Sequence, residues 1–318
     1  MKTVILDAYT MNPGDLSWEG WENLGDFVKY DRTPKELVVQ RASDAEIVLV
    51  NKVRMTAEVI AQLPKLRYIG VLATGYDVVD VQAAKKAGIT VTNVPAYSTD
   101  SVAQLVFAFI LEHCQKVALY SQEVHKGAWQ TSPDFTFSIA PTIELAGKTL
   151  GIIGLGRIDM KVADIGHAFG MNVLGYRRNP PAALPSWLTI APIETLFKSA
   201  DFLTCHCPLT PETRALINAN NLALMKRSAF LVNTSRGPVI DELALADALN
   251  TGQIAGAAVD VLAQEPPSNG SPLLNAKNCL ITPHFAWATQ EARIRLNQVA
   301  LKNVKAFLAG TPVNVVSR

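Results

Sequence analysis

The sequence has few cysteines, no long hydrophobic run and almost no net charge. Its four cysteines, among 318 residues, are too few and too scattered for a disulfide framework. No apolar stretch reaches the roughly 18 residues that a membrane-spanning helix requires, because charged residues, proline or glycine interrupt each one. The formal net charge is +1, which gives no indication of a polyanionic partner. We therefore expect reduced thiols and neither a membrane protein nor a nucleic-acid-binding protein.

Targeting and metal-binding signals are also absent. The apolar run that begins at Val4 stops at Asp7, far short of the core of a signal peptide. Cys205, His206 and Cys207 are adjacent, but no second Cys/His pair stands near them in the sequence, as a zinc site would require. We expect a cytoplasmic protein without a metal ion.

Short runs rich in valine and isoleucine alternate with longer amphipathic stretches. This alternation is typical of α/β proteins with parallel sheets. The chain is also long enough for two domains that each bury a core. The predicted strands are residues 3–7, 46–50, 68–71, 90–93, 149–153, 173–176, 202–205, 230–233, 257–260 and 280–282.

Two long helices are predicted. The first covers residues 101–120, with Thr99 and Asp100 as its cap, and the second covers residues 290–308, closed by Gly310 and Pro312. Residues 126–147, between the first helix and the next strand, are rich in proline, serine and threonine and lack periodicity. They predict an excursion on the surface.

A glycine turn follows the strand at residues 149–153. Gly154 and Gly156 stand before Arg157 and Ile158, which open a helical pattern. In a dinucleotide-binding fold the first glycine makes the turn, the second lets the backbone approach the pyrophosphate, and the helix N-terminus donates N–H groups. The third glycine of that motif is replaced by Asp159, whose charge would lie near the phosphates. The turn predicts a dinucleotide site, with an ordinary strand–turn–helix connection as the alternative.

The next strand ends in two arginines rather than an acidic residue. An acidic side chain about 20 residues after the glycines normally binds the ribose hydroxyls of NAD, but Arg177 and Arg178 stand there. Two guanidinium groups suit a 2′-phosphate. We therefore expect NADP(H) in preference to NAD(H), unless both arginines are only solvated surface residues.

Three charged or titratable residues follow later strands. Arg236 comes just after the strand at residues 230–233, Glu265 lies in a proline-rich loop, and His284 follows the last strand. An arginine can hold a substrate carboxylate with two hydrogen bonds. A histidine titrates near neutrality and can give a proton to a keto oxygen, and an adjacent carboxylate orients it. The set predicts the reduction of a 2-keto acid.

Several separated motifs resemble the D-isomer-specific 2-hydroxyacid dehydrogenase family over nearly the whole chain. They are residues 72–80, 97–104, 144–156, 206–213, 233–237 and 283–284. The resemblance implies two Rossmann-like, doubly wound parallel-sheet domains with the active site in a cleft between them. Residues 1–99 with 288–318 would bind the substrate, residues 100–287 would bind the dinucleotide, and the protein would be a homodimer.

The resemblance also assigns roles to residues. Arg236, Glu265 and His284 match the family's catalytic arginine, glutamate and acid/base histidine, and Asp260 matches the residue beside the nicotinamide. The backbone of Ala73, Thr74 and Gly75 would hold the substrate carboxylate. Pro208 and Thr213 would line the cofactor cleft.

Residues 72–76 and 284–293 are similar to glycerate dehydrogenases, which reduce hydroxypyruvate and often glyoxylate. Asp77, where that subgroup has asparagine, adds a negative charge near an anionic substrate, and Asp159 adds one near the cofactor. Three alternatives therefore stay open: another D-2-hydroxy acid such as lactate, a fold whose activity Asp159 abolishes, and a dinucleotide-sensing regulator that resembles the C-terminal binding proteins.

Overall fold

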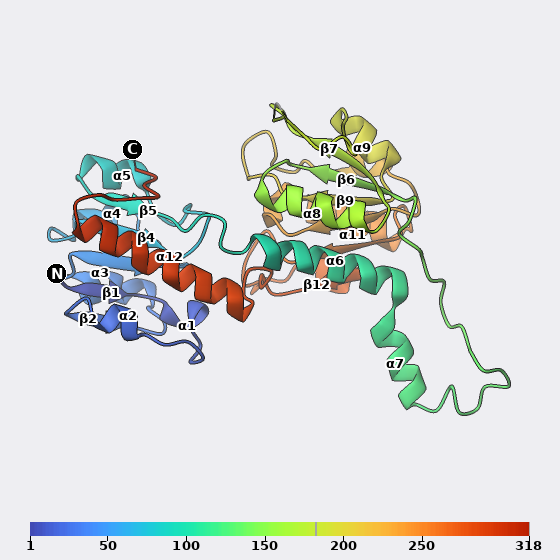
Figure 1. The fold of residues 1–318 in the computed structure, drawn as a ribbon, viewed down its shortest axis with the longest axis horizontal. Coiled ribbons are helices and arrows are strands. Elements are labelled where there is room, and N and C mark those ends of the chain that lie inside the picture. The colour runs from blue at the N-terminus through green and yellow to red at the C-terminus, as the bar shows by residue number, and fades with distance from the viewer. Residues whose placement is uncertain (182, 318) are drawn as a thin grey trace. The chain divides into compact units, whose positions relative to one another are not determined.

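The computed structural model describes residues 1–181 and 183–317. The chain divides into two compact units, Met1–Ser98 with Trp287–Arg318 and Thr99–Ala286. Each unit contains one sheet, and all the strand pairs within both sheets are parallel (Figure 1). The α/β class with two parallel sheets, predicted from the sequence, is confirmed.

The first unit has a five-stranded sheet in the order β2-β1-β3-β4-β5. Such an order steps outward in both directions from the first strand and is that of a doubly wound sheet. The elements of this unit are β1 (Thr3–Ile5), α1 (Ala8–Met11), α2 (Glu19–Glu22), β2 (Phe27–Lys29), η1 (Lys35–Leu37), α3 (Val38–Ala42), β3 (Ile47–Val50), α4 (Ala57–Ala61), β4 (Tyr68–Val71), α5 (Val81–Lys86), β5 (Thr90–Thr92) and α12 (Gln290–Leu308).

Helices cover both faces of this sheet. Successive residues of a strand point to opposite faces, so Val48 and Val50 pack in one hydrophobic core with residues of α3, α4 and α5. Ile47 and Leu49 pack in a second core with residues of α1, α2 and α12, including Leu296. All four strand residues are fully buried, which explains their uninterrupted apolar run.

The second unit has a seven-stranded sheet in the order β12-β11-β10-β9-β6-β7-β8. Its strand order reverses between β6 and β9, and ligands bind at the carboxyl ends of strands beside such a point. The elements are α6 (Thr99–Gln115), α7 (Val117–His125), β6 (Thr149–Ile153), α8 (Arg157–Ala168), β7 (Asn172–Tyr176), β8 (Leu188–Ile190), α9 (Ile193–Ser199), β9 (Phe202–Cys205), α10 (Ala219–Ala223), β10 (Phe230–Asn233), η2 (Gly237–Val239), α11 (Glu242–Asn250), β11 (Gly256–Val259), η3 (Pro272–Asn275) and β12 (Cys279–Ile281).

Two hydrophobic cores lie on the two faces of the second sheet. Leu150 and Ile152 of β6 pack with α6 and α8, whereas Ile153 packs with residues of α9, α10 and α11. Several helices begin where a side chain accepts a hydrogen bond from the first turn, which satisfies a backbone N–H group that the helix leaves unpaired. These capping residues are Thr56, Asp80, Asn218, Asp241 and Thr289.

The sequence did not indicate β2 and β8. Each has three residues, lies at the edge of its sheet and is partly exposed, so neither carries the apolar run that marks a buried strand. The other strands lie within two residues of their predicted bounds, and α12 covers the predicted residues.

The prediction of one helix over residues 101–120 is wrong. α6 ends at Gln115, Lys116 has a φ of 51°, and α7 continues at an angle of 53°. The backbone N–H of Ile143 donates to the carbonyl of Cys114, which caps the end of α6. In Figure 1, α7 leads away from the sheet of its unit, and none of its residues is buried.

Across the described part of the chain, no single helix is long and apolar enough to cross a membrane. α6 and α7 meet that criterion only when they are taken together across their bend, and α6 contributes several residues to a hydrophobic core.

Candidate active site

Six neighbouring strands of the second unit end in register, at Tyr176, Ile153, Cys205, Asn233, Val259 and Ile281. Because the strands are parallel, the segments that follow them meet at one edge of the sheet. The glycine turn, Arg177, Pro208, Arg236, Asp260 and His284 each follow one of these ends within a few residues. The fold therefore gathers residues that are up to about 130 positions apart in the sequence.

The glycine turn has the geometry that a phosphate group requires. Gly154 has a φ of 123°, a conformation that favours glycine. Gly156 is the N-cap of α8, so Arg157 and Ile158 occupy the first turn of a 12-residue helix. The positive end of that helix dipole lies at the turn. These features fit the pyrophosphate of a dinucleotide.

Asp159 bears on that fit, because its carboxyl group lies inside the turn. Oδ2 accepts a hydrogen bond of 2.7 Å from the backbone N–H of Gly156, and a Cβ atom on Gly154 would overlap Oδ1. Asp159 is 4% exposed, and Oδ1 has no hydrogen-bond partner among the described residues. Burial raises the pKa of Asp159 to about 6, although the Gly156 N–H group opposes this shift. The turn thus fits a dinucleotide and also contains an acidic group of its own.

Arg177 folds back toward the glycine turn from the end of β7. Its Nη1 atom donates to the carbonyl of Leu155 at 3.1 Å, and its side chain lines a surface hollow with Leu155, Gly156 and Arg157. Arg178 is exposed. A basic side chain therefore stands at the end of β7, where NAD-binding folds commonly carry an acidic one.

Pro208 and Thr213 lie in the segment that follows β9. The hydroxyl of Thr213 donates to the carbonyl of Pro208 at 2.6 Å and accepts from the backbone N–H of Thr210 at 2.8 Å. These bonds close a turn that joins the two residues. The sequence predicts that both residues line a cofactor site, but it does not predict the hydrogen bond between them.

Arg236 follows β10 in a turn that Asn233 holds. Asn233 is fully buried, and its side chain accepts from the backbone N–H of Ser235 and donates to the carbonyl of Arg236, both at 3.0 Å. Next to the arginine, Gly237 packs so closely that a Cβ atom there would overlap the backbone of Leu262. The Arg236 turn is thus pressed against the loop that carries Glu265. Sequence reasoning gave Asn233 no role, although it stands in the same motif.

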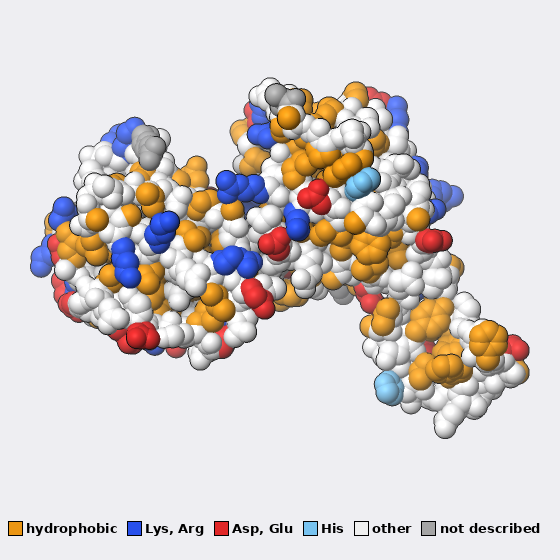
Figure 2. Space-filling view, in the orientation of Figure 1, with side chains coloured by type: hydrophobic (Ala, Val, Ile, Leu, Met, Phe, Trp, Pro, Cys, Tyr) orange, Lys and Arg blue, Asp and Glu red, His pale blue; other side chains and the backbone are white. Residues whose placement is uncertain are grey.

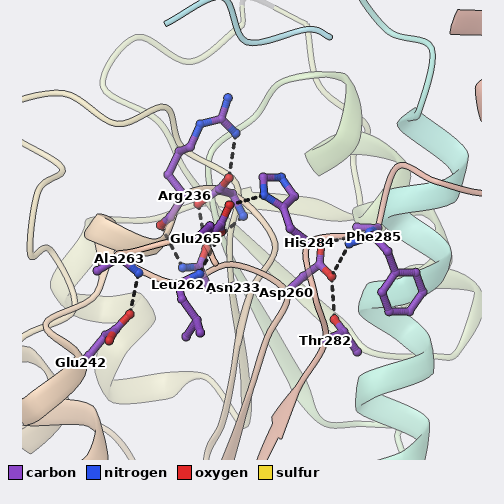
Figure 3. Close-up of polar contacts among 12 residues, drawn as sticks. Asn233, Arg236, Glu242, Asp260, Leu262, Ala263, Glu265, Thr282, His284 and Phe285 are labelled. Atoms are coloured by element: carbon purple, nitrogen blue, oxygen red, sulfur yellow. Dashed lines mark hydrogen bonds and ion pairs between the residues drawn. The ribbon is translucent and has the colours of Figure 1, made fainter. Parts of the chain in front are cut away.

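Glu265 and His284 are hydrogen-bonded. Oε2 of Glu265 lies 2.6 Å from Nδ1 of His284, and Oε1 accepts from the backbone N–H of Leu262 at 3.0 Å. Figure 3 shows the two side chains pointing toward one another, with Arg236 in the same close-up. His284 has a φ of 53°, which is uncommon for a residue with a side chain and occurs often at functional sites.

Asp260 anchors the loop that carries His284. Its carboxylate accepts from the hydroxyl of Thr282 at 2.6 Å and from the backbone N–H groups of Phe285 and Ala286 at 2.9 and 3.0 Å (Figure 3). Burial raises the pKa of Asp260, and these hydrogen bonds oppose the shift. The sequence indicated Asp260 as a neighbour of the nicotinamide; that role stays a prediction.

A second glutamate supports the Glu265 loop. Glu242, at the start of α11, accepts from the backbone N–H of Ala263 at 2.6 Å and from the hydroxyl of Ser271 at 2.7 Å. Sequence reasoning missed it, because an acidic residue in the first turn of a helix is ordinary.

His206 lies beyond β9, between two threonines. The hydroxyl oxygens of Thr204 and Thr234 lie 2.8 and 3.3 Å from its ring nitrogens. Burial lowers the pKa of His206 to about 3, so the ring is neutral at physiological pH. In the residues that the structure describes, no three histidine, cysteine or acidic side chains are arranged to hold a metal ion.

Ala73, Thr74 and Gly75 follow β4 in the first unit. The Thr74 hydroxyl donates to the carbonyl of Val94 at 2.9 Å, and the Asn93 side chain donates to the carbonyl of Thr74 at 2.7 Å. The backbone N–H of Val94 donates to the carbonyl of Ala73 at 2.9 Å. The segment is therefore held against the end of β5.

The sequence and the fold are similar to those of known proteins. Residues 107–286 match the family described as "D-isomer specific 2-hydroxyacid dehydrogenase, NAD binding domain". The chain is 47% identical to a hydroxypyruvate reductase of Blautia hydrogenotrophica, with all of both chains covered. It is 43% identical to a glycerate dehydrogenase of Methylorubrum extorquens, over 99% of this chain and 98% of the relative.

Two solved structures have the same fold and different dinucleotides. A D-lactate dehydrogenase from Aquifex aeolicus, complexed with NAD and lactic acid, has a TM-score of 0.85 and 30% identity over 99% of both chains. An acyclic imino acid reductase, in complex with NADPH and D-Arg, has a TM-score of 0.85 and 32% identity over 99% of this chain and all of that one. With these matches over the glycine turn and the residues at the strand ends, the chain belongs to the D-isomer-specific 2-hydroxyacid dehydrogenases, oxidoreductases that use a nicotinamide dinucleotide.

Proposed function

We propose that the protein reduces hydroxypyruvate and glyoxylate to D-glycerate and glycolate, with NADPH as its preferred reductant, and catalyses the reverse reactions. The observation that carries the proposal is the 2.6 Å contact between Glu265 and His284, at the same sheet edge as Arg236. A proton donor and a carboxylate-binding group are what the reduction of a 2-keto acid requires. The names of the two relatives, a hydroxypyruvate reductase and a glycerate dehydrogenase, support the choice of substrate.

His284 gives a proton to the keto oxygen of the substrate. Glu265 accepts from Nδ1, which leaves Nε2 as the atom that holds and transfers the proton. The hydrogen bond to the carboxylate also fixes the plane of the ring. In the reverse direction the neutral ring accepts the hydroxyl proton at the same nitrogen.

Arg236 binds the substrate carboxylate. A guanidinium group can form two parallel hydrogen bonds to a carboxylate, and it also stabilises negative charge that develops on the neighbouring carbonyl oxygen. We propose that backbone groups of Ala73, Thr74 and Gly75 also bind the substrate. The bonds of Thr74 to Val94 and Asn93 would keep these groups in place before the substrate arrives.

The bound dinucleotide supplies the hydride that is transferred to the keto carbon. Gly154, Gly156 and the first turn of α8, with Arg157 and Ile158, would hold its pyrophosphate. Pro208, Thr213 and Asp260 would line the rest of the site.

Arg177 and Arg178 would bind the 2′-phosphate of NADPH, because they present charge and forked donors at the end of β7. The position of Arg177, bonded to Leu155 and beside Arg157, supports this preference.

We further propose that the protein is a homodimer that covers α7 and the segment after it. Large apolar side chains are exposed there, among them Val117 at 64%, Trp129 at 54% and Phe135 at 90%. Figure 2 shows hydrophobic side chains gathered on this part of the second unit. Isolated helices shorter than about 12 residues are marginally stable in water, and α7 has nine residues, none of them buried. A second copy of the chain would bury its apolar side chains.

The test is a set of initial rates with hydroxypyruvate, glyoxylate and pyruvate, each with NADPH and NADH, from the absorbance at 340 nm. We expect the two proposed substrates to have the highest kcat/KM, and NADPH to be favoured. Higher kcat/KM for pyruvate would move the proposal to D-lactate. If none of the three keto acids is turned over, the proposed reaction is wrong, and the protein acts on another substrate or has a binding role.

Arg177→Ala tests the preference for the cofactor. Loss of charge-assisted hydrogen bonds to a phosphate costs about 1.5–3 kcal/mol, so kcat/KM for NADPH should fall about 10- to 100-fold while that for NADH changes little. Lys198→Ala removes an exposed cation on α9 and serves as the control. An equal fall with both cofactors would assign Arg177 a role in the turn rather than in phosphate recognition.

A further inference from the structure

We propose that Asp159 takes up a proton when the protein binds its nicotinamide dinucleotide, so that this residue limits cofactor affinity as the pH rises. The proposal rests on dinucleotide binding, which the family establishes, and on neither the identity of the keto acid nor the preference for NADPH. The proton comes from solvent, and no bond other than the O–H bond of the carboxyl group is formed.

The first support is the position of the carboxyl group. It lies between Gly154 and Gly156, the two glycines of the phosphate turn, and its Oδ2 atom accepts the N–H bond of Gly156. Asp159 therefore provides a negative group of the chain itself at the helix end where the pyrophosphate would bind. A bound pyrophosphate would add two negative charges close to this buried carboxyl group.

The second support is that Oδ1 has no hydrogen-bond partner among the residues that the structure describes. Burying a carboxylate oxygen that accepts no hydrogen bond destabilises the charged form of the group. Burying the neutral, protonated acid costs less free energy. Most buried polar atoms in proteins do have a hydrogen-bond partner. The exception at Oδ1 therefore favours the protonated form of the Asp159 carboxyl group.

The groups around Asp159 do little to hold its charge. From β7, Arg177 favours the carboxylate, but that guanidinium is exposed and already donates to Leu155. From the end of β9, burial raises the pKa values of the Cys205 and Cys207 thiols, and it lowers that of His206. All three side chains are therefore neutral near pH 7.

On α8 itself, Arg157 and Lys161 line the surface hollow with Asp164. Lys161 lies 3.6 Å from Asp100 of α6. These charged groups lie at the surface of the unit, where solvent weakens their effect on a buried carboxylate.

The direction of the effect follows from linkage. The pKa of Asp159 is about 6 in the free protein, and a nearby pyrophosphate raises it further. Below pH 6 the group is already protonated, and affinity does not depend on its titration. Above pH 6 each dinucleotide binds with a proton, so the dissociation constant rises about tenfold per pH unit until the pKa of the complex is reached.

The experiment is calorimetric titration with NADH at pH 7 in two buffers of different ionisation enthalpy, which yields the number of protons taken up. NADH is used because a 2′-phosphate titrates near pH 6 itself. We expect the wild-type protein to take up close to one proton more than Asp159→Asn, whose affinity should vary less between pH 6 and 8. Asp159→Gly, which restores the third glycine, should behave like Asp159→Asn.

Asp164→Asn is the matched control, because it removes an exposed negative charge from the same helix. It should keep the proton uptake of the wild type. If Asp159→Asn and the wild type take up the same number of protons, or if the ratio of their dissociation constants is constant from pH 6 to 8, the proposal is wrong. Proton uptake by the wild-type protein can be measured even if a variant fails to fold. The measurement also tests the proposal if the protein binds NADH but does not reduce hydroxypyruvate.

Discussion

At the scale of single residues, the site depends on carboxylates that use both of their oxygens. Glu265 joins the imidazole of His284 to the backbone of Leu262, and Glu242 joins Ala263 to Ser271 in the same way. Only Glu265 contacts a group that can transfer a proton. A carboxylate can accept on both oxygens at once, whereas an amide has a single oxygen to accept with.

Glu265→Gln should therefore lower kcat while leaving KM nearly unchanged. The amide can accept from either Leu262 or His284, and its NH2 group then faces the other donor. Loss of an oriented acid/base group typically reduces the rate about 100-fold or more. Steady-state kinetics with hydroxypyruvate would measure the change.

Glu242→Gln provides the comparison, because it alters an equivalent pair of hydrogen bonds that includes no histidine. This variant should lose stability and retain most of its kcat. Equal losses of kcat in the two variants would mean that Glu265 acts only by holding its loop.

Asp159 should make the free protein less stable as the pH rises. Its pKa is about 6 in the folded protein against 3.8 in the reference state, so the folded state binds the proton more tightly. Stability is lost between these two values and stays lost at higher pH. The difference of roughly two units corresponds to about 3 kcal/mol.

Asp159→Asn should consequently be more stable than the wild type above pH 6, by up to about 3 kcal/mol, and the gain should shrink toward pH 4. Urea unfolding of both proteins across this pH range would measure it. A gain that does not change with pH would show that the charge of Asp159 is not its cause.

At this scale the sequence indicated the candidate catalytic residues but not how the structure holds them. Arg236, Glu265 and His284 could be selected because each follows a predicted strand. Asp260 accepts three hydrogen bonds from residues that follow another strand, and Asn233 accepts from Ser235 and donates to the carbonyl of Arg236 across a turn. Spacing along the chain does not reveal such bonds.

At the scale of elements, the sequence predicted the ends of the buried strands but not the break between α6 and α7. Buried parallel strands have continuous apolar runs, which mark their bounds in the sequence. The apolar pattern of α6 continues through Val117 and Leu119, yet α6 ends at Gln115. Its last turn is capped by Ile143, 28 residues further on than Gln115, and a pattern within the helix contains no information about that contact.

Gly237→Ala should disturb the site through two elements at once. The added Cβ atom would overlap the backbone of Leu262, so either the Arg236 turn or the Glu265 loop must move. Overpacking of this kind costs about 1–3 kcal/mol, and a shift of the Glu265 loop should lower kcat as well. Chemical denaturation and initial rates would measure the two effects.

Gly256→Ala is the control for this variant. A Cβ atom there would lie 3.0 Å from the carbonyl oxygen of Asn278 and 3.1 Å from the ring of Phe230. Gly256 is the first residue of β11 and lies away from the carboxyl ends of the strands. It should cost stability with little change in kcat, and a similar fall in kcat in both variants would contradict the explanation.

At the scale of the whole molecule, the exposed apolar side chains of α7 and the following segment predict a dimer of 34.4 kDa chains. Sedimentation equilibrium should give about twice the chain mass. Val117→Asp with Phe135→Asp should convert the protein to monomers, because both side chains would become charged within a buried apolar contact.

Leu274→Asp changes a similarly exposed apolar residue, 49% exposed, on η3. It should leave the mass unchanged. A wild-type protein that sediments as a monomer, or a variant with Val117→Asp and Phe135→Asp that remains a dimer, would contradict the proposed interface.

The sequence by itself determined the alternation of strands and helices, the glycine turn and the positions of the candidate catalytic side chains after predicted strands, because each depends on neighbouring residues in the chain. Only the tertiary structure decided where α6 ends, how closely Gly237 packs against the loop that carries Glu265, and that the Asp159 carboxyl group lies inside the phosphate turn, with one oxygen that has no hydrogen-bond partner in the described part of the chain. Those features depend on atoms that the chain brings together only when it folds, so their energies cannot be assigned from local sequence alone.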